Sequence, residues 1–300
     1  MKTSRPLALW GVFACTLAFL AIGAVSLGAQ AKPVTVVAAE NFYGDIVHQI
    51  GGNRVTVTSI MSDPNIDPHE YESSVDDARA IADADLVIEN GGGYDDWMDK
   101  LLSASPRASR QVIKGFDLAP NKLPENEHVW YGVDNVGTIG DAVVRALSRA
   151  RPDGAAEFAK NNRAFQASLE QIKSRMAQIA ARWPEAPVGL TETIFLYQAA
   201  PLRLKVLTPF EFQKAIAEGN DPPADAVVEA EDQIKNKKIR ILIYNEQTVS
   251  AITTKAQDDA KAAGIPVVGV TETMPQGETY QSWMLRQLDE VRMALTGAGS

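Results

Sequence analysis

Residues 153–183 read DGAAEFAKNNRAFQASLEQIKSRMAQIAARW and form the longest helical pattern in the chain. Asp153 can cap the start of this helix, and Pro184 ends it directly after Trp183. About 28 residues at a rise of ~1.5 Å each give ~42 Å, enough to cross a whole domain. Its apolar residues follow steps of three, four and seven and therefore share one helix face: Phe158, Phe165, Leu169, Ile172, Met176 and Ile179.

Strand-like and helical runs alternate on both sides of this helix. Before it, we predict strands at 34–39, 55–60, 86–88 and 111–113, and helices at 42–50, 74–82 and 94–102. After it, we predict strands at 188–190, 204–206, 239–244 and 267–270, and helices at 209–217, 224–234, 253–263 and 278–295. This alternation predicts an α/β fold with two lobes, each a mainly parallel sheet flanked by helices.

The predicted division of the chain follows from this pattern. Residues 1–31 form a leader, 32–150 an N-terminal α/β lobe, 151–184 the long linking helix and 185–300 a C-terminal α/β lobe. Two lobes joined by one long helix should move little against each other.

The leader has the pattern of a cleavable signal peptide. Lys2 and Arg5 precede an apolar stretch at 7–25, and Ala29-Gln30-Ala31 is a small-x-small cleavage pattern. We therefore expect export to the periplasm. An uncleaved membrane anchor and a lipid attached at Cys15 are the alternatives.

Charge and cysteine content narrow the function. Cleavage removes Lys2 and Arg5 and no acidic residue, so the net charge of −9 becomes −11. Such an acidic chain is not expected to bind nucleic acid or an anionic membrane, although it is compatible with a cation. The single cysteine, Cys15, lies in the leader, so disulfides and thiolate metal sites are excluded from the mature chain.

The tripeptide Thr-Glu-Thr occurs twice, each time directly after a predicted buried strand. Glu192 follows the strand at 188–190, and Glu272 follows the strand at 267–270. Ligands bind at the carboxyl edge of such sheets, and two carboxylates brought together there repel unless a positive charge lies between them. Alternatively, both are helix-start residues, where an acid is favourable by ~0.3–1 kcal/mol.

The chain has three histidines, two of them in loops. His48 lies in the helix at 42–50, and we predict a plain surface residue. His69 lies in a loop stiffened by Pro64 and Pro68, and His128 lies in the long polar loop 114–135. Each loop histidine is either a ligand or an incidental loop residue. Together with Glu192 and Glu272 they would give two nitrogen and two oxygen donors, a set that suits Zn²⁺, Mn²⁺ or Fe²⁺.

Six motifs in order also resemble a known family. They are VVAAENFYGDI at 36–46, QIGG at 49–52, DPHEYE at 67–72, NEHVW at 126–130, TETIF at 191–195 and VTET at 270–273. Over essentially the whole mature length the chain resembles the periplasmic solute-binding proteins of zinc/manganese ABC transporters, in the cluster with a rigid linking helix.

The resemblance implies a protein that captures Mn²⁺ or Zn²⁺ between two lobes and hands it to the permease subunits of an ABC transporter. The ligands would be His69, His128, Glu192 and Glu272, with Glu278 as a competitor for the fourth place. Glu272 stands where members usually have aspartate, and Glu127 stands where they usually have proline. The histidine-rich loop of many zinc-specific members is absent, which weakens a zinc assignment.

Three other functions remain open from the sequence. A metal-dependent hydrolase would use Glu70 or Glu127 as general base, next to a metal with a water ligand. A binding protein for haem or a siderophore would need an aromatic or arginine-lined cleft. An adhesin would hold the metal as a structural ion. We expect a monomeric binding protein and not an enzyme, because four protein ligands leave no coordination position open for catalysis.

Overall fold

The computed structural model describes residues 1–3, 32–63 and 71–297. His69, Glu70 and residues 4–31 of the predicted leader therefore lie outside the described residues. None of the helices in the described ranges is long and apolar enough to span a membrane. Pro33–Ser300 forms one compact unit of the chain.

The first sheet is built from four parallel strands. They are β1 (Val34–Glu40), β2 (Val55–Met61), β3 (Leu86–Glu89) and β4 (Gln111–Lys114), in the order β2-β1-β3-β4. β1 lies inside the sheet, where Val36 is opposite Val57 of β2 and Leu86 of β3. Its run of valine and alanine suits a strand that is covered on both faces.

The second sheet repeats this order. Its parallel strands are β5 (Pro187–Leu190), β6 (Lys205–Val206), β7 (Ile241–Asn245) and β8 (Val267–Val270), arranged β6-β5-β7-β8. The predicted strands agree with the observed ones to within two residues. The prediction of two parallel-sheet lobes is confirmed.

Helices cover both sheets. Beside the first lie α1 (Asn41–Gly51), α2 (Val75–Asp83), α3 (Asp96–Ala104), α4 (Gly115–Leu118) and α5 (Val133–Ala150), with short 3-10 turns η1 (Gly52–Arg54), η3 (Val129–Tyr131) and η4 (Pro152–Gly154). Beside the second lie α7 (Leu196–Ala199), α8 (Phe210–Ala217), α9 (Ala224–Lys235), α10 (Ala251–Ala262) and α11 (Tyr280–Gly297). α4 and η3 lie within residues 114–135, so that predicted loop is partly helical.

The sequence pattern predicts no helix where the structure has α5. Interior glycines lower helix propensity by ~1 kcal/mol relative to alanine, and α5 contains Gly137 and Gly140. The structure explains both glycines, because α6 (Ala155–Arg182) packs closely there. A Cβ on Gly137 would lie 2.9 Å from Gln166 Oε1, and one on Gly140 would lie 3.0 Å from Asn162 Oδ1.

α6 is the predicted long helix, with 28 residues and its predicted apolar face buried. One detail of the prediction is wrong, since Asp153 does not cap α6. The N-cap is Gly154, without a side-chain hydrogen bond, because η4 precedes the helix. The Asp153 carboxylate instead pairs with Arg54 at 2.9 Å and with Arg151 at 3.3 Å.

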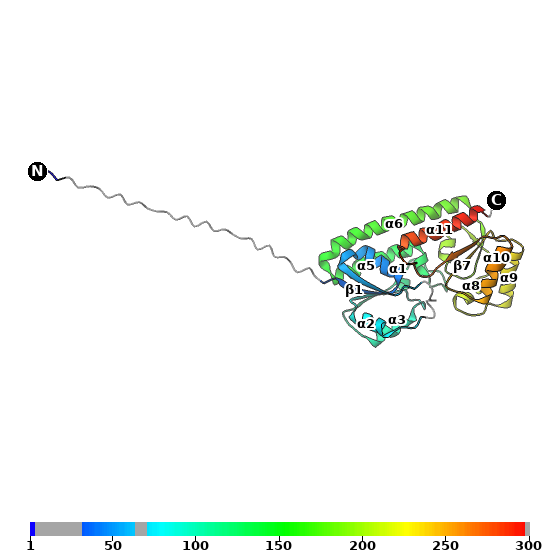
Figure 1. The fold of residues 1–300 in the computed structure, drawn as a ribbon, viewed down its shortest axis with the longest axis horizontal. Helices are drawn as coiled ribbons and strands as arrows, with labels where there is room; N and C mark the ends of the chain where they lie inside the picture. The colour runs from blue at the N-terminus through cyan, green and yellow to red at the C-terminus, as the bar shows by residue number, and fades with distance from the viewer. Residues whose placement is uncertain (4–31, 64–70, 298–300) are drawn as a thin grey trace. The chain divides into compact units, whose positions relative to one another are not determined.

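α6 and α11 run side by side and connect the two halves (Figure 1). α11 follows the second sheet in the chain, yet it also contacts α1 beside the first. One hydrophobic core includes Val36 and Leu86 of the first sheet, Phe165 of α6, and Val188 and Ile241 of the second sheet. The division at 32–150, 151–184 and 185–300 therefore stays a prediction.

Candidate metal centre

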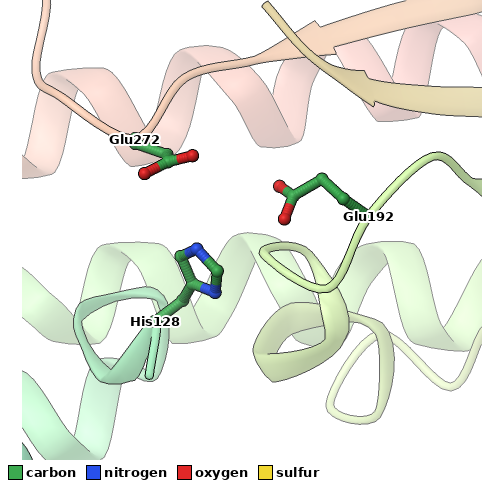
Figure 2. Close-up of side chains that lie close together, drawn as sticks. All are labelled: His128, Glu192 and Glu272. Atoms are coloured by element: carbon green, nitrogen blue, oxygen red, sulfur yellow. The ribbon is translucent and has the colours of Figure 1, made fainter. Parts of the chain in front are cut away.

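Three side chains from distant parts of the chain meet at the carboxyl edges of the two sheets. His128, Glu192 and Glu272 each bring one ligand atom to within 4.8 Å of the others. Figure 2 shows the three side chains pointing toward one another. All three are buried, with 0%, 2% and 1% of their surface exposed. Glu192 follows β5 and Glu272 follows β8, as the Thr-Glu-Thr pattern predicts.

The structure excludes the alternative reading of these glutamates as helix-start residues. After Glu192, α7 begins only at Leu196, its N-cap residue is Phe195, and its first turn has no acidic residue. After Glu272, the next helix begins only at Tyr280. The two carboxylates therefore lie in the loops that leave the strand ends and not in the first turn of a helix.

Of the two carboxylates in the three-residue cluster, Glu192 has fewer hydrogen-bond donors around its oxygens. Its carboxylate oxygens are buried, and within the described ranges no hydrogen bond of normal geometry reaches them. Burial raises the pKa of Glu192 well above its usual range, and the charge of Glu272 raises it further, although the backbone N–H groups of Ile194 and Thr193 act in the opposite direction. Burial and the neighbouring carboxylate both favour the protonated form of Glu192, whereas a bound dication would favour its charged form.

Glu272 is held in place through its backbone and its side chain. Gln247 Oε1 accepts hydrogen bonds from the backbone N–H of Glu272 at 2.7 Å and of Thr273 at 3.0 Å. Asn245 Nδ2 donates to Glu272 Oε1 at 2.5 Å, and the Tyr94 hydroxyl donates to Oε2 at 2.9 Å. The orientation of this carboxylate is fixed before any metal binds.

Asn126 orients the His128 ring. Its Oδ1 lies 2.9 Å from His128 Nδ1 and also accepts the backbone N–H of His128 at 3.1 Å, while its Nδ2 donates to the carbonyl of Thr193 at 2.8 Å. These contacts determine which atom of the amide is oxygen, so Nδ1 of His128 is the protonated nitrogen. Nε2 then has the lone pair that a metal requires, as expected for a neutral imidazole ligand with an acceptor on its other nitrogen.

Buried aromatic side chains pack beside His128 in the cluster. Trp130 lies edge-on to His128 with ring centroids 5.2 Å apart, and Tyr94 packs against Trp130 at 4.6 Å. Trp130 and Tyr94 are buried. In such surroundings the attraction between a dication and carboxylates is only weakly screened.

The remaining predicted residues lie elsewhere. His48 is exposed on α1, as predicted. Glu278 is ion-paired with Arg286 at 2.8 Å and does not belong to the three-residue cluster. Glu127 is half-buried next to the cluster, where its charge also raises the pKa of Glu192. His69 and Glu70 lie outside the described residues.

Sequence reasoning missed the residues that hold the ligands in place, namely Tyr94, Asn126, Asn245 and Gln247. Asn245 ends β7 and so lies at the same sheet edge as Glu192 and Glu272, which was an available signal. Tyr94 follows three glycines, a pattern typical of an unusual backbone.

Comparison with known proteins gives one family throughout. A family model described as the periplasmic zinc-uptake complex component A matches residues 36–294. The metal ABC transporter substrate-binding lipoprotein SloC of Streptococcus mutans is 25% identical over 97% of this chain and 96% of its own length. The manganese-binding lipoprotein MntA of Halalkalibacterium halodurans is 25% identical over 92% of this chain and 96% of its own length.

Solved structures share the fold. The periplasmic zinc-binding protein TroA from Treponema pallidum superposes with a TM-score of 0.75 at 21% identity, covering 88% of this chain and 99% of its own. At 21% identity, this similarity shows that the two proteins share a fold and nothing more.

Proposed function

The chain belongs to the family of the periplasmic zinc-uptake complex component A, and from this membership we propose that it captures a divalent transition metal ion outside the cytoplasm and delivers it to the permease subunits of an ABC transporter. The cargo is Mn²⁺ or Zn²⁺, with Fe²⁺ as a third candidate. One similar protein is named for manganese binding, and the family is named for zinc uptake.

The cluster of one imidazole and two carboxylates is the observation on which this proposal rests. His128, Glu192 and Glu272 supply one nitrogen and two oxygens within 4.8 Å of one another, in a buried setting. Divalent Zn²⁺ and Mn²⁺ accept such mixed ligands. We propose His69, from the Asp-Pro-His motif, as the second imidazole, which completes a set of four protein ligands.

For the second carboxylate we prefer Glu272 to Glu278. The Glu278 carboxylate is already neutralised by Arg286 at 2.8 Å, and a metal ligand there would have to give up that ion pair. Glu272 faces Glu192, and a dication between them relieves their repulsion.

The proposal treats the chain as a binding protein and not as an enzyme. A hydrolytic metal site keeps one position for water, whereas four protein ligands close a site around its ion. The comparisons give no support to the hydrolase, haem or siderophore alternatives. We further propose that residues 1–31 direct the protein to the periplasm and that it works as a monomer.

Metal uptake tests the proposal directly. The protein is unfolded with a chelator, refolded without metal, and offered equimolar Mn²⁺, Zn²⁺ and Fe²⁺, after which bound metal is measured by elemental analysis. We expect one ion per chain. No stoichiometric uptake of any of the three metals would overturn the proposal.

Single substitutions test the ligands. His69→Ala, His128→Ala, Glu192→Ala and Glu272→Ala should each weaken binding by more than the ~10–100-fold that loss of a ligand's hydrogen-bond partner typically costs. Glu278→Ala is the matched control and should leave the affinity unchanged. If Glu278→Ala weakens binding and Glu272→Ala does not, the assignment of Glu272 is wrong.

A further inference from the structure

Tyr94 is held by a loop with an unusual backbone between β3 and α3. The loop Asn90–Asp95 contains Gly91, Gly92 and Gly93, with φ angles of +72°, +69° and +95°. Residues with side chains rarely adopt three such conformations in succession, so the glycines are needed for this path. The path turns the chain at the end of β3 and presents Tyr94 to the opposite half of the molecule.

Hydrogen bonds hold this loop in one conformation. The Asp95 carboxylate accepts the backbone N–H groups of Asn90 at 2.6 Å and Gly91 at 2.7 Å. The Asn90 side chain accepts from the Tyr43 hydroxyl at 2.7 Å and donates to the carbonyl of Glu127 at 3.0 Å. The position of Tyr94 is therefore determined by buried contacts on both sides of it.

The Tyr94 hydroxyl bridges the two halves of the fold. It donates to Glu272 Oε2 at 2.9 Å, across 178 positions of sequence. Tyr94 is 2% exposed, and its hydroxyl is the donor because the carboxylate oxygen that it faces is an acceptor. Tyr280 makes a comparable buried contact across the molecule, but its hydroxyl donates to the backbone carbonyl of Trp130 at 2.7 Å.

The two anchors act on opposite oxygens of the same carboxylate. Asn245 holds Oε1 and Tyr94 holds Oε2, so the Glu272 carboxylate cannot turn without breaking one of these hydrogen bonds. A carboxylate held in this way is less free to rotate until both of its oxygens face the same ion. One-oxygen ligands suit four-coordinate Zn²⁺, whereas Mn²⁺ favours more oxygen ligands in an octahedral arrangement.

We propose that Tyr94 is a positioning residue that restricts Glu272 to one-oxygen binding and thereby shifts the metal preference of the site toward Zn²⁺ relative to Mn²⁺. This inference rests on the proposed function of the same site. The inference is about the ratio of the Zn²⁺ and Mn²⁺ affinities. If Tyr94 only stiffened the site, its loss would lower both affinities by the same factor. If it keeps the second oxygen of Glu272 away from the metal, its loss favours Mn²⁺ over Zn²⁺.

Tyr94→Phe removes the hydroxyl and keeps the ring that packs on Trp130. Affinities of the metal-free full chain for Mn²⁺ and Zn²⁺ are measured separately by competition with a chelating dye. The Zn²⁺ affinity should fall by ~10–100-fold, typical for a lost partner of a metal ligand, and the Mn²⁺ affinity should fall less. Asn245→Ala removes the shorter contact to the other oxygen, leaves the Thr248 hydroxyl at 3.4 Å, and should change the ratio in the same direction.

Tyr280→Phe is the matched control, because it deletes a buried hydroxyl that does not end on a ligand, and it should leave the ratio unchanged. Equal losses for both metals in Tyr94→Phe and Asn245→Ala would overturn the inference while leaving the proposed function intact. Failure of the unsubstituted protein to bind either metal would overturn the proposed function and this inference with it.

Discussion

Glu40 and Asp95 form a buried pair of carboxyl groups, and the replacement Glu40→Gln tests how that pair is neutralised. Glu40 ends β1 and is 0% exposed, and Asp95 is 2% exposed. Asp95 accepts two backbone N–H groups and so bears the charge. Burial raises the pKa of Glu40 well above its usual range, and the Asp95 charge raises it further, so Glu40 is the carboxyl group of the pair that keeps the proton.

The sign of the pH effect follows from proton linkage. In the unfolded chain, Glu40 loses its proton above a pKa of about 4.3. Above that pH, Glu40 must therefore take up a proton from the solvent when the chain folds. The stability that this group contributes is fully present below the unfolded pKa and is lost as the pH rises toward the folded pKa. As long as folded Glu40 stays protonated, each pH unit costs ~1.36 kcal/mol, or about 2.7 kcal/mol between pH 5 and pH 7.

Glu40→Gln removes this cost, because an amide is uncharged beside Asp95 at any pH. The advantage of the variant over the original chain should therefore grow by up to about 2.7 kcal/mol from pH 5 to pH 7. At roughly 2–4 °C per kcal/mol for a chain of this size class, the difference in Tm should grow by roughly 5–10 °C. Thermal unfolding of the metal-free protein, followed by circular dichroism at pH 5, 6 and 7, measures it.

Glu229→Gln is the matched control, since Glu229 is exposed on α9. Its Tm difference from the original chain should be small and independent of pH. Glu89 also has a raised pKa, of about 7, through burial, but it is present in every variant and cancels in the comparison. Parallel pH profiles for Glu40→Gln and the original chain would refute a protonated Glu40.

Three further predictions concern the site and the core. A free cargo-metal concentration of a hundred times the Kd should raise the free energy of unfolding by ~2.7 kcal/mol, and a chelator should reverse this gain. The gain is measured as a higher Tm in a thermal melt, and an unchanged Tm would contradict binding to the folded state. Asn126→Ala deletes the acceptor of His128 Nδ1 and should weaken metal binding by ~10–100-fold in calorimetry, whereas an unchanged affinity would show that the ring is oriented otherwise. Leu169→Ala on the buried face of α6, 1% exposed, should cost ~2–5 kcal/mol in urea unfolding, and a loss no greater than that of the exposed substitution Lys160→Ala would contradict the packing described.

The parts of the fold that the sequence predicts are those decided by local patterns. Buried parallel strands appear as short apolar runs, and the apolar face of α6 appears in its spacing. α5 and the partner of Asp153 were missed because they depend on distant residues. Gly137 and Gly140 are explained only by the close packing of α6 against α5, and Asp153 contacts Arg54, 99 positions earlier in the chain.

The site divides in the same way. Glu192 and Glu272 were predictable, because each follows a buried strand and parallel strands end at one edge of a sheet. The groups that orient the ligands were not, because their hydrogen bonds cross the molecule. Tyr94 and Glu272 are 178 positions apart, and Asn126 reaches Thr193 over 67 positions.

The strand-end rule alone selects too many carboxyl groups, since Glu40 ends β1 and Glu89 ends β3 as well. Their surroundings separate them from the metal cluster. Glu89 is neutralised by Lys114 at 2.9 Å, and Glu40 is neutralised by its own proton beside Asp95. Glu192 has no ion pair within the described ranges, and its nearest charge is the repelling carboxylate of Glu272. A strand-end carboxylate therefore indicates a cation site when it is buried without an ion pair and faces both a second carboxylate and an imidazole, and among these three glutamates that criterion selects Glu192.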